Sequence, residues 1–175
     1  MTVILDDSTT TAALEEFLHA RELLLSIVAN AASLVSSLIR HEELSVVCLG
    51  GRYGAVMDAF LGVDCEMALK RPRADLGAFS AAAVRGGAAY LHESELIRAK
   101  IAMKAAAERS ILADDHIEFG KSALHLFGRL KEFDCIFTTM GADQAEIDRP
   151  RASEVPIEVV PIDTAFKVGV GRMLQ

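Results

Sequence analysis

The stretch TVILDDSTTT, residues 2–11, changes from apolar to polar at its midpoint and decides how the rest of the chain is interpreted. The apolar run Val3–Leu5 predicts a buried strand, because short apolar runs bounded by turn residues are typical of parallel sheets. The pattern from Thr10 to Leu18 predicts a helix. A strand followed at once by a helix is the first part of a βαβ unit.

The same alternation continues to the end of the chain. Further apolar runs predict strands at Leu24–Val28, Leu44–Leu49, Phe60–Gly62, Leu76–Ser80, Ile111–Ala113, Cys135–Phe137 and Pro156–Val160. Helical periodicity predicts helices at Ala31–Ile39, Asp64–Leu69, Glu93–Glu108, Ser122–Leu130 and Ala142–Ile147. We therefore expect an α/β fold, with a mostly parallel sheet and helices on both faces, in a single domain over residues 1–175, with Pro150–Pro156 as a loop.

The composition is that of a folded, acidic protein. Hydrophobic residues make up 51% of the 175 residues, which excludes disordered classes and favours a homo-oligomer with a buried interface. The net charge of −7 argues against a DNA-binding surface within these residues, because phosphate contacts need clustered Lys and Arg. Three cysteines and the lack of a leader or of a membrane-length apolar run predict a cytoplasmic location and no membrane partner.

Small and polar residues follow the ends of most predicted strands. Ligands of open α/β sheets bind outside the carboxyl ends of the strands, so the pattern predicts a pocket for a small polar ligand. Loops are polar in any α/β protein, which is the alternative explanation. The candidate pocket residues, including a lysine that interrupts the apolar stripe of its helix, are Asp6, Ser8, Thr9, Thr10, Asn30, Gly50, Gly51, Ser80, Lys100 and Asp115.

Two of these features have a second interpretation. The hydroxyls at the start of the first helix form either a phosphate site with the backbone N–H groups or a simple helix cap by Asp7 or Ser8. Three consecutive threonines, residues 9–11, exceed what a cap requires and favour phosphate. Lys100 either enters the pocket, near Thr9 and Thr10, or reaches bulk solvent from the edge of the stripe.

Motifs for other chemistries do not occur in the sequence. There is no G-x-G-x-x-G after the first strand, no G-x-x-x-x-G-K-[ST] and no nucleophile elbow. The histidines His116 and His125 lack the spacing of a zinc site. We expect no catalytic residue, no metal and no cofactor.

Several short motifs occur in a set order along nearly the whole chain. Leu5–Thr11 resembles D-S-G-[ST]-T and Val28–Ala31 resembles V-T-N-S. The later ones are a G-G strand at Val47–Gly51, A-D-x-A-F-L-[GS]-A at Ala74–Ala81, E-x(4)-K-x-x-M at Glu95–Met103, D-[HS]-S-K-F-G at Asp115–Gly120 and D-x-[IV]-I-T-D at Phe133–Thr139. Their order and spacing resemble the effector-binding domain of DeoR-type bacterial transcriptional regulators.

The resemblance implies a fold related to ribose-5-phosphate isomerase and glucosamine-6-phosphate deaminase, and a sugar-phosphate effector. It also implies an N-terminal helix-turn-helix that reads DNA, and palindromic operators favour a two-fold oligomer. Only two residues precede the first predicted strand, so we expect the DNA-binding winged helix to be absent from this chain. Either the chain is trimmed or it is a stand-alone sensor.

The chain departs from the family pattern at three places. Ser8 replaces a glycine, and alanines replace the Thr and Ser that flank Asn30. Glu118 stands where the family has a lysine, which is the natural phosphate partner. A carboxylate there repels a phosphate, so we expect Glu118 to lie in the effector site and to weaken sugar-phosphate binding unless Lys121 takes over. The effector would then be a neutral polyol or sugar, a cationic group, or a phosphate held only at Thr9 and Thr10.

Two functions compete on this fold. The first is a sensor domain without chemistry, and the second is a sugar-phosphate isomerase or deaminase. Such enzymes carry an acidic motif after a middle strand, whereas Ser80–Ala83 has no acid and Asp75 precedes its strand. The sequence therefore favours the sensor, with a scaffold that binds no ligand as a third possibility.

Overall fold

A computed structural model describes residues 1–15, 24–152 and 154–161. Its centre is a seven-stranded sheet in the order β12-β11-β9-β6-β1-β2-β3, and every neighbouring pair is parallel. The strands are β1 Thr2–Leu5, β2 Ser26–Ala29, β3 Ser45–Cys48, β6 Ala74–Phe79, β9 Ala107–Asp114, β11 Cys135–Thr139 and β12 Ile157–Val160. The predicted α/β fold with a mostly parallel sheet is confirmed.

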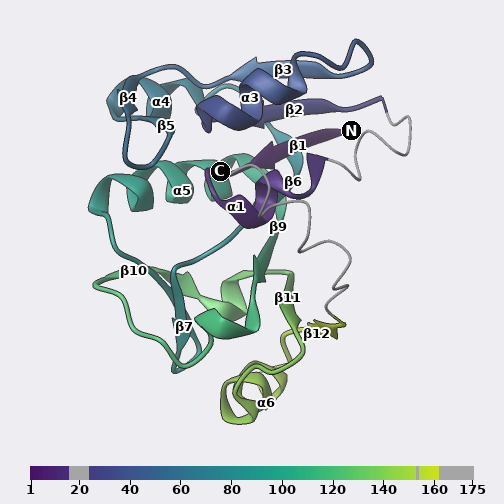
Figure 1. Ribbon diagram of the computed structural model, residues 1–175, viewed down its shortest axis with the longest axis vertical. Coiled ribbons are helices and arrows are strands. Elements are labelled where there is room, and N and C mark those ends of the chain that lie inside the picture. Colours follow the sequence, from purple (N-terminus) through teal and green to yellow (C-terminus); the bar gives the residue numbers. More distant parts are fainter. Residues whose placement is uncertain (16–23, 153, 162–175) are drawn as a thin grey trace, which may run out of the picture.

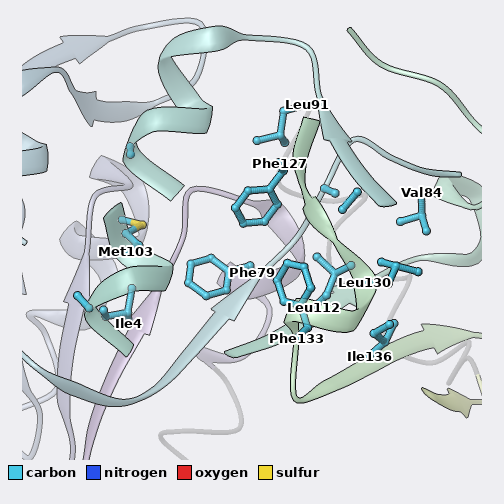
Figure 2. Packing of buried hydrophobic residues seen from close by; sticks show 14 of the residues in the cluster. Ile4, Phe79, Val84, Leu91, Met103, Leu112, Phe127, Leu130, Phe133 and Ile136 are labelled. Carbon is cyan, nitrogen blue, oxygen red and sulfur yellow. The ribbon is translucent and has the colours of Figure 1, made fainter. Parts of the chain in front are cut away.

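Helices cover both faces of this sheet (Figure 1). Side chains of one strand alternate between the faces, so Ile4 and Val28 pack on the side of α4 and α5, whereas Leu5 and Ile27 pack on the side of α3. Figure 2 shows the larger of the two cores, where Phe79 meets Phe127, which in turn contacts Phe133. The helices are α1 Thr9–Ala12, α3 Ala32–Leu38, α4 Val63–Ala68, α5 Ser94–Ala106 and α6 Gln144–Ala152.

A small antiparallel sheet, β10-β8-β7, packs beside α5 and was not predicted. Its strands are β7 Ala83–Arg85, β8 Ala88–Leu91 and β10 His125–Arg129. Gly86 and Gly87 join β7 to β8 and both have positive φ angles, 63° and 78°, which glycine adopts at little cost. A second hairpin, β4 Arg52–Gly54 with β5 Ala59–Leu61, packs against the end of β2, where Ala59 forms a bridge with Ala31.

The predicted helix Ser122–Leu130 is wrong, because this segment forms β10 and leads into a 3₁₀ turn at Leu130–Glu132. Leu126 and Phe127 are consecutive, yet Leu126 is exposed and Phe127 is buried, as in a strand. A register shift between Leu126 and Gly128 then produces an apolar spacing that imitates a helix.

Three other boundaries differ from the prediction. The first helix, α1, ends at Ala12, and the predicted part over residues 16–18 lies outside the described residues. Helix α6 runs to Ala152, so the beginning of the predicted loop Pro150–Pro156 is helical. Helix α5 passes directly into β9 at Ala107 without a loop. None of the described helices is long and apolar enough to cross a membrane.

Candidate functional site

A cavity of about 710 Å³ opens at the carboxyl ends of β1, β6 and β9. This is the sheet edge where the sequence predicts a pocket. Of the predicted site residues, Ser8, Thr9, Thr10, Ser80, Lys100, Asp115 and Glu118 line it. The other lining residues are Asp7, Ala81, Ala82, Leu91, His92, Leu96, Ile117, Lys121 and Ser122.

Lys100 forms the floor of the cavity and does not reach bulk solvent. Its side chain is 3% exposed, and its Nζ lies 2.7 Å from Asp6 Oδ2, whose side chain is fully buried. The same Nζ donates to the Ser80 carbonyl oxygen over 2.8 Å and lies 3.7 Å from Asp7 Oδ1. The interpretation of Lys100 as a snorkelling lysine is therefore wrong.

The charges of the floor stabilise one another. Burial alone would lower the pKa of Lys100, but the carboxylates of Asp6 and Asp7 outweigh it and raise that pKa. Burial acts against the charge of Asp6 as well, yet Lys100 and the Ser80 N–H keep the Asp6 pKa below its ordinary value. Burial raises the pKa of Asp7, which Lys100 offsets only in part. Asp7 Oδ1 is buried and accepts no hydrogen bond from the described residues.

Asp114, the last residue of β9, supports the floor from below. Its Oδ1 accepts from Ser80 Oγ at 2.6 Å and from the Ala81 N–H at 2.8 Å. Burial raises the pKa of Asp114 to about 7, although these hydrogen bonds and Lys100 act in the opposite direction. Its Oδ2 is buried without a partner among the described residues, and Asp114 does not line the cavity. Asp114 is thus a buried acid that titrates near neutral pH.

The start of α1 is capped by its own side chains. Ser8 Oγ accepts from the Thr11 N–H at 3.1 Å, and Asp6 Oδ1 accepts from the Ser8 N–H at 3.0 Å. Thr11 is buried and its Oγ1 donates to Asp6 Oδ1 over 2.9 Å. Capping therefore occupies Ser8 and Thr11, while Thr9 and Thr10 border the cavity.

The rim of the cavity carries exposed charges. Glu118 lies in a 3₁₀ turn, His116–Glu118, and its Oε2 accepts from Lys121 Nζ at 3.3 Å. Asp115 Oδ1 accepts from Thr139 Oγ1 at 2.7 Å and also contacts the His116 ring. Partial burial would raise the pKa of Asp115, but these neighbours outweigh it and lower that pKa. Glu118 and Lys121 therefore both face the cavity as an ion pair.

Four predicted site residues do not line the cavity. Asp6 lies beneath it as the partner of Lys100. Asn30 is buried at the end of β2, where its Nδ2 donates to the Phe60 carbonyl and its backbone carbonyl accepts from the Phe60 N–H. Gly50 and Gly51 lie in the exposed loop after β3, and a Cβ on Gly51 would come within 2.5 Å of the Leu61 carbonyl oxygen.

The sequence of this chain is similar to a known protein family and to a known regulator. The family model described as the DeoR C terminal sensor domain matches residues 1–139. The chain is also 28% identical over 142 residues to the transcriptional repressor AccR of Agrobacterium fabrum (strain C58). That alignment covers 80% of this chain and 55% of the repressor, so the chain spans about half the length of this relative.

Proposed function

This chain belongs to the DeoR C-terminal sensor domain family, and we propose that it senses a small carbohydrate metabolite for a transcriptional regulator. The cavity over Lys100 would hold the effector. The state of that cavity would control DNA binding by a helix-turn-helix domain of the regulator. The observation that carries the proposal is a cavity lined by hydroxyls above a buried, charged floor, at the edge of the sheet where α/β proteins bind ligands.

The lining suits a polyhydroxylated molecule. Thr9, Thr10 and Ser122 offer hydroxyl groups that both donate and accept, as sugar hydroxyls do. Leu91 and Leu96 supply apolar lining to the same cavity. A volume of about 710 Å³ lies within the range of small-molecule sites and exceeds what a pentose or hexose needs.

The charges disfavour a doubly charged phosphate. Three carboxylates, Asp7, Asp115 and Glu118, line the cavity together with only two lysines. Lys100 is already paired with Asp6, and Lys121 is paired with Glu118. We therefore propose a neutral sugar or polyol, or an effector with a cationic group, as the tighter ligand, and weak binding of ordinary sugar phosphates.

Glu118→Lys tests this assignment by calorimetry with ribose, ribose 5-phosphate, glucose 6-phosphate, glucosamine and glucosamine 6-phosphate. The variant should gain about tenfold or more in affinity for the phosphates, and the unphosphorylated sugars should change little. Glu108→Lys, an equal charge change at the opposite end of β9, is the control and should bind like the unmodified chain. Tight phosphate binding by the unmodified chain, unchanged by Glu118→Lys, would contradict the role of Glu118.

A sugar-phosphate isomerase or deaminase is the alternative, and Asp114 is the observation that favours it. A carboxyl group with a pKa of about 7 is suited to proton transfer. Asp114 lies under Ala81 and outside the cavity lining, however, so it has no direct route to a ligand. Turnover of ribose 5-phosphate or glucosamine 6-phosphate that disappears in Asp114→Asn would establish the enzyme and overturn the sensor.

A further inference from the structure

The two edges of the central sheet differ in how they are protected. Strand β12 carries Glu158 and lies between Pro156 and Pro161, and charge and proline are features that prevent edge strands from pairing. Strand β3 has the sequence SVVC, without charge or proline, and three of its four residues are exposed. Within the described ranges, β3 pairs only with β2. The two edges lie at opposite ends of the molecule (Figure 1).

The register with β2 determines which backbone groups of β3 face the open edge. The Ser45 N–H donates to the Leu25 carbonyl, just before β2, over 3.0 Å, and the Leu49 N–H donates to the Ala29 carbonyl, the last in β2, over 2.9 Å. Because the N–H and C=O of one strand residue point to the same side, residues 45, 47 and 49 face β2. Val46 and Cys48 therefore direct both of their backbone groups outward.

We propose that β3 is a dimerisation edge, which pairs antiparallel with β3 of a second copy about a two-fold axis at Val47. In this register Val46 of each copy exchanges both backbone hydrogen bonds with Cys48 of the other, so all four outward groups of each strand are satisfied. Val47, which is 46% exposed, then lies opposite Val47 of the second copy in a non-hydrogen-bonded pair. The two central sheets become one continuous sheet.

Charges at the two ends of β3 favour this antiparallel pairing. Glu42 lies exposed in the turn before the strand, and Arg52 follows it. Antiparallel pairing brings Glu42 of one copy toward Arg52 of the other, whereas parallel pairing would bring like charges together. Arg52 also pairs with Glu95 of its own chain, but its side chain is 63% exposed and can accept a second carboxylate.

Exposed apolar side chains flank the same edge and would enlarge the interface. Ile39 ends α3, the helix that contacts β3 on one face. Val63 and Met67 are exposed on α4, which lies on the other face beside the loop after β3, where a Cβ on Gly51 would lie 3.4 Å from the Cys65 Cβ. A stable dimer needs more buried area than two short strands supply, roughly 1,200 Å² in total, and these side chains are placed to contribute it. The inference does not depend on the effector.

Val47→Lys tests the interface in the full chain by sedimentation velocity at about 1–100 µM. The unmodified chain should be a dimer and Val47→Lys a monomer, because two lysines would meet at the axis. Val159→Lys makes the same change on the opposite edge strand and should remain a dimer. Circular dichroism should show that both variants are folded. A monomeric unmodified chain, or a dimer lost in Val159→Lys and kept in Val47→Lys, would overturn the proposal.

Val47→Cys in a Cys48→Ser background tests the register with a smaller change. Cα atoms of a non-hydrogen-bonded antiparallel pair lie about 4.5 Å apart, which a disulfide can span. Treatment with diamide should therefore convert most of Val47→Cys into a covalent dimer, whereas Val159→Cys in the same background should stay uncrosslinked. Equal crosslinking of the two variants would show collision rather than pairing and would refute the register.

Discussion

The floor and the rim of the cavity are both built on a lysine–carboxylate pair, and burial gives the two pairs opposite properties. Lys100 and Asp6 at the floor are 3% and 0% exposed, whereas Lys121 and Glu118 at the rim are 53% and 23% exposed. A buried pair has lost its hydration, so each partner depends on the other, while water screens an exposed pair. The floor therefore supports stability, and the rim is free to serve recognition.

Lys100→Met should have the largest effect, because it leaves Asp6 and Asp7 buried without a counter-charge. We expect a loss of about 3–5 kcal/mol in the free energy of unfolding, measured by urea denaturation. Adding Asp6→Asn to Lys100→Met should recover part of this loss. Lys121→Met is the matched control at the rim and should change the free energy of unfolding by less than about 0.5 kcal/mol. Equal losses at floor and rim would contradict the comparison.

Asp114→Asn should have an intermediate effect that depends on pH. The pKa of Asp114 is about 7 in the folded protein and near 4 in the unfolded chain, so the unfolded chain loses its proton first as the pH rises. The charge of Asp114 therefore costs stability progressively between pH 4 and pH 7, and the cost is constant above pH 7. The variant should become more stable relative to the unmodified chain over this range, by up to a few kcal/mol.

The control for Asp114 is its neighbour. Asp115 is partly exposed and its pKa is lowered, so Asp115→Asn should show the opposite trend, with a small relative loss of stability as the pH rises from acid to neutral. Urea denaturation from pH 2 to pH 8 measures both, because the Asp115 trend falls below about pH 5 and the Asp114 trend lies between about pH 4 and pH 7. A difference between Asp114→Asn and the unmodified chain that stays flat from pH 4 to pH 7 would contradict the raised pKa of Asp114.

Glu118→Lys should affect stability less than Lys100→Met or Asp114→Asn. It replaces a screened ion pair by two nearby lysines, so we expect a change below about 1 kcal/mol in the free energy of unfolding. The same variant should still change phosphate affinity about tenfold, as proposed above. A thermal unfolding measurement without ligand separates the two quantities, and a large loss of stability would place Glu118 with the floor rather than the rim.

The central sheet could be predicted from sequence because most of its strands contain a short apolar run. Strand β1 and the polar residues after it show this pattern most clearly. The first half of β9, which carries Glu108, Arg109 and Ser110, lacks this signal. The small sheet could not be predicted in the same way, since Ala83–Arg85 and Ala88–Leu91 are short and Val84 is their single β-branched residue. Gly86 and Gly87 were the available signal for the hairpin.

Site residues could be predicted where a polar residue interrupts an apolar sequence pattern. They could not be predicted where the direction of the side chain in the folded sheet decides whether it reaches the cavity. Lys100 stood out because it interrupts an apolar stripe. Asp114 and Asp115 are adjacent, and only the pairing of β9 with its neighbours determines that Asp114 turns into the core while Asp115 borders the cavity. Asn30 could not be separated from a ligand-binding residue because its partner, Phe60, is 30 positions away along the chain.

The composition of the cavity floor determines when, during its synthesis, the chain becomes able to bind a ligand. Its members come from residues 6, 80, 100 and 114, and β1 must pair with β6 as well as with β2. At about 5–20 residues per second, on the order of 10 seconds separate the synthesis of Asp6 from that of Asp114. For most of this time Asp6 lacks its partner Lys100, and no fragment that ends before Ser122 contains the whole lining of the pocket. Ligand-binding ability therefore arrives late, once the chain through β9 and the rim residues up to Ser122 has left the ribosome.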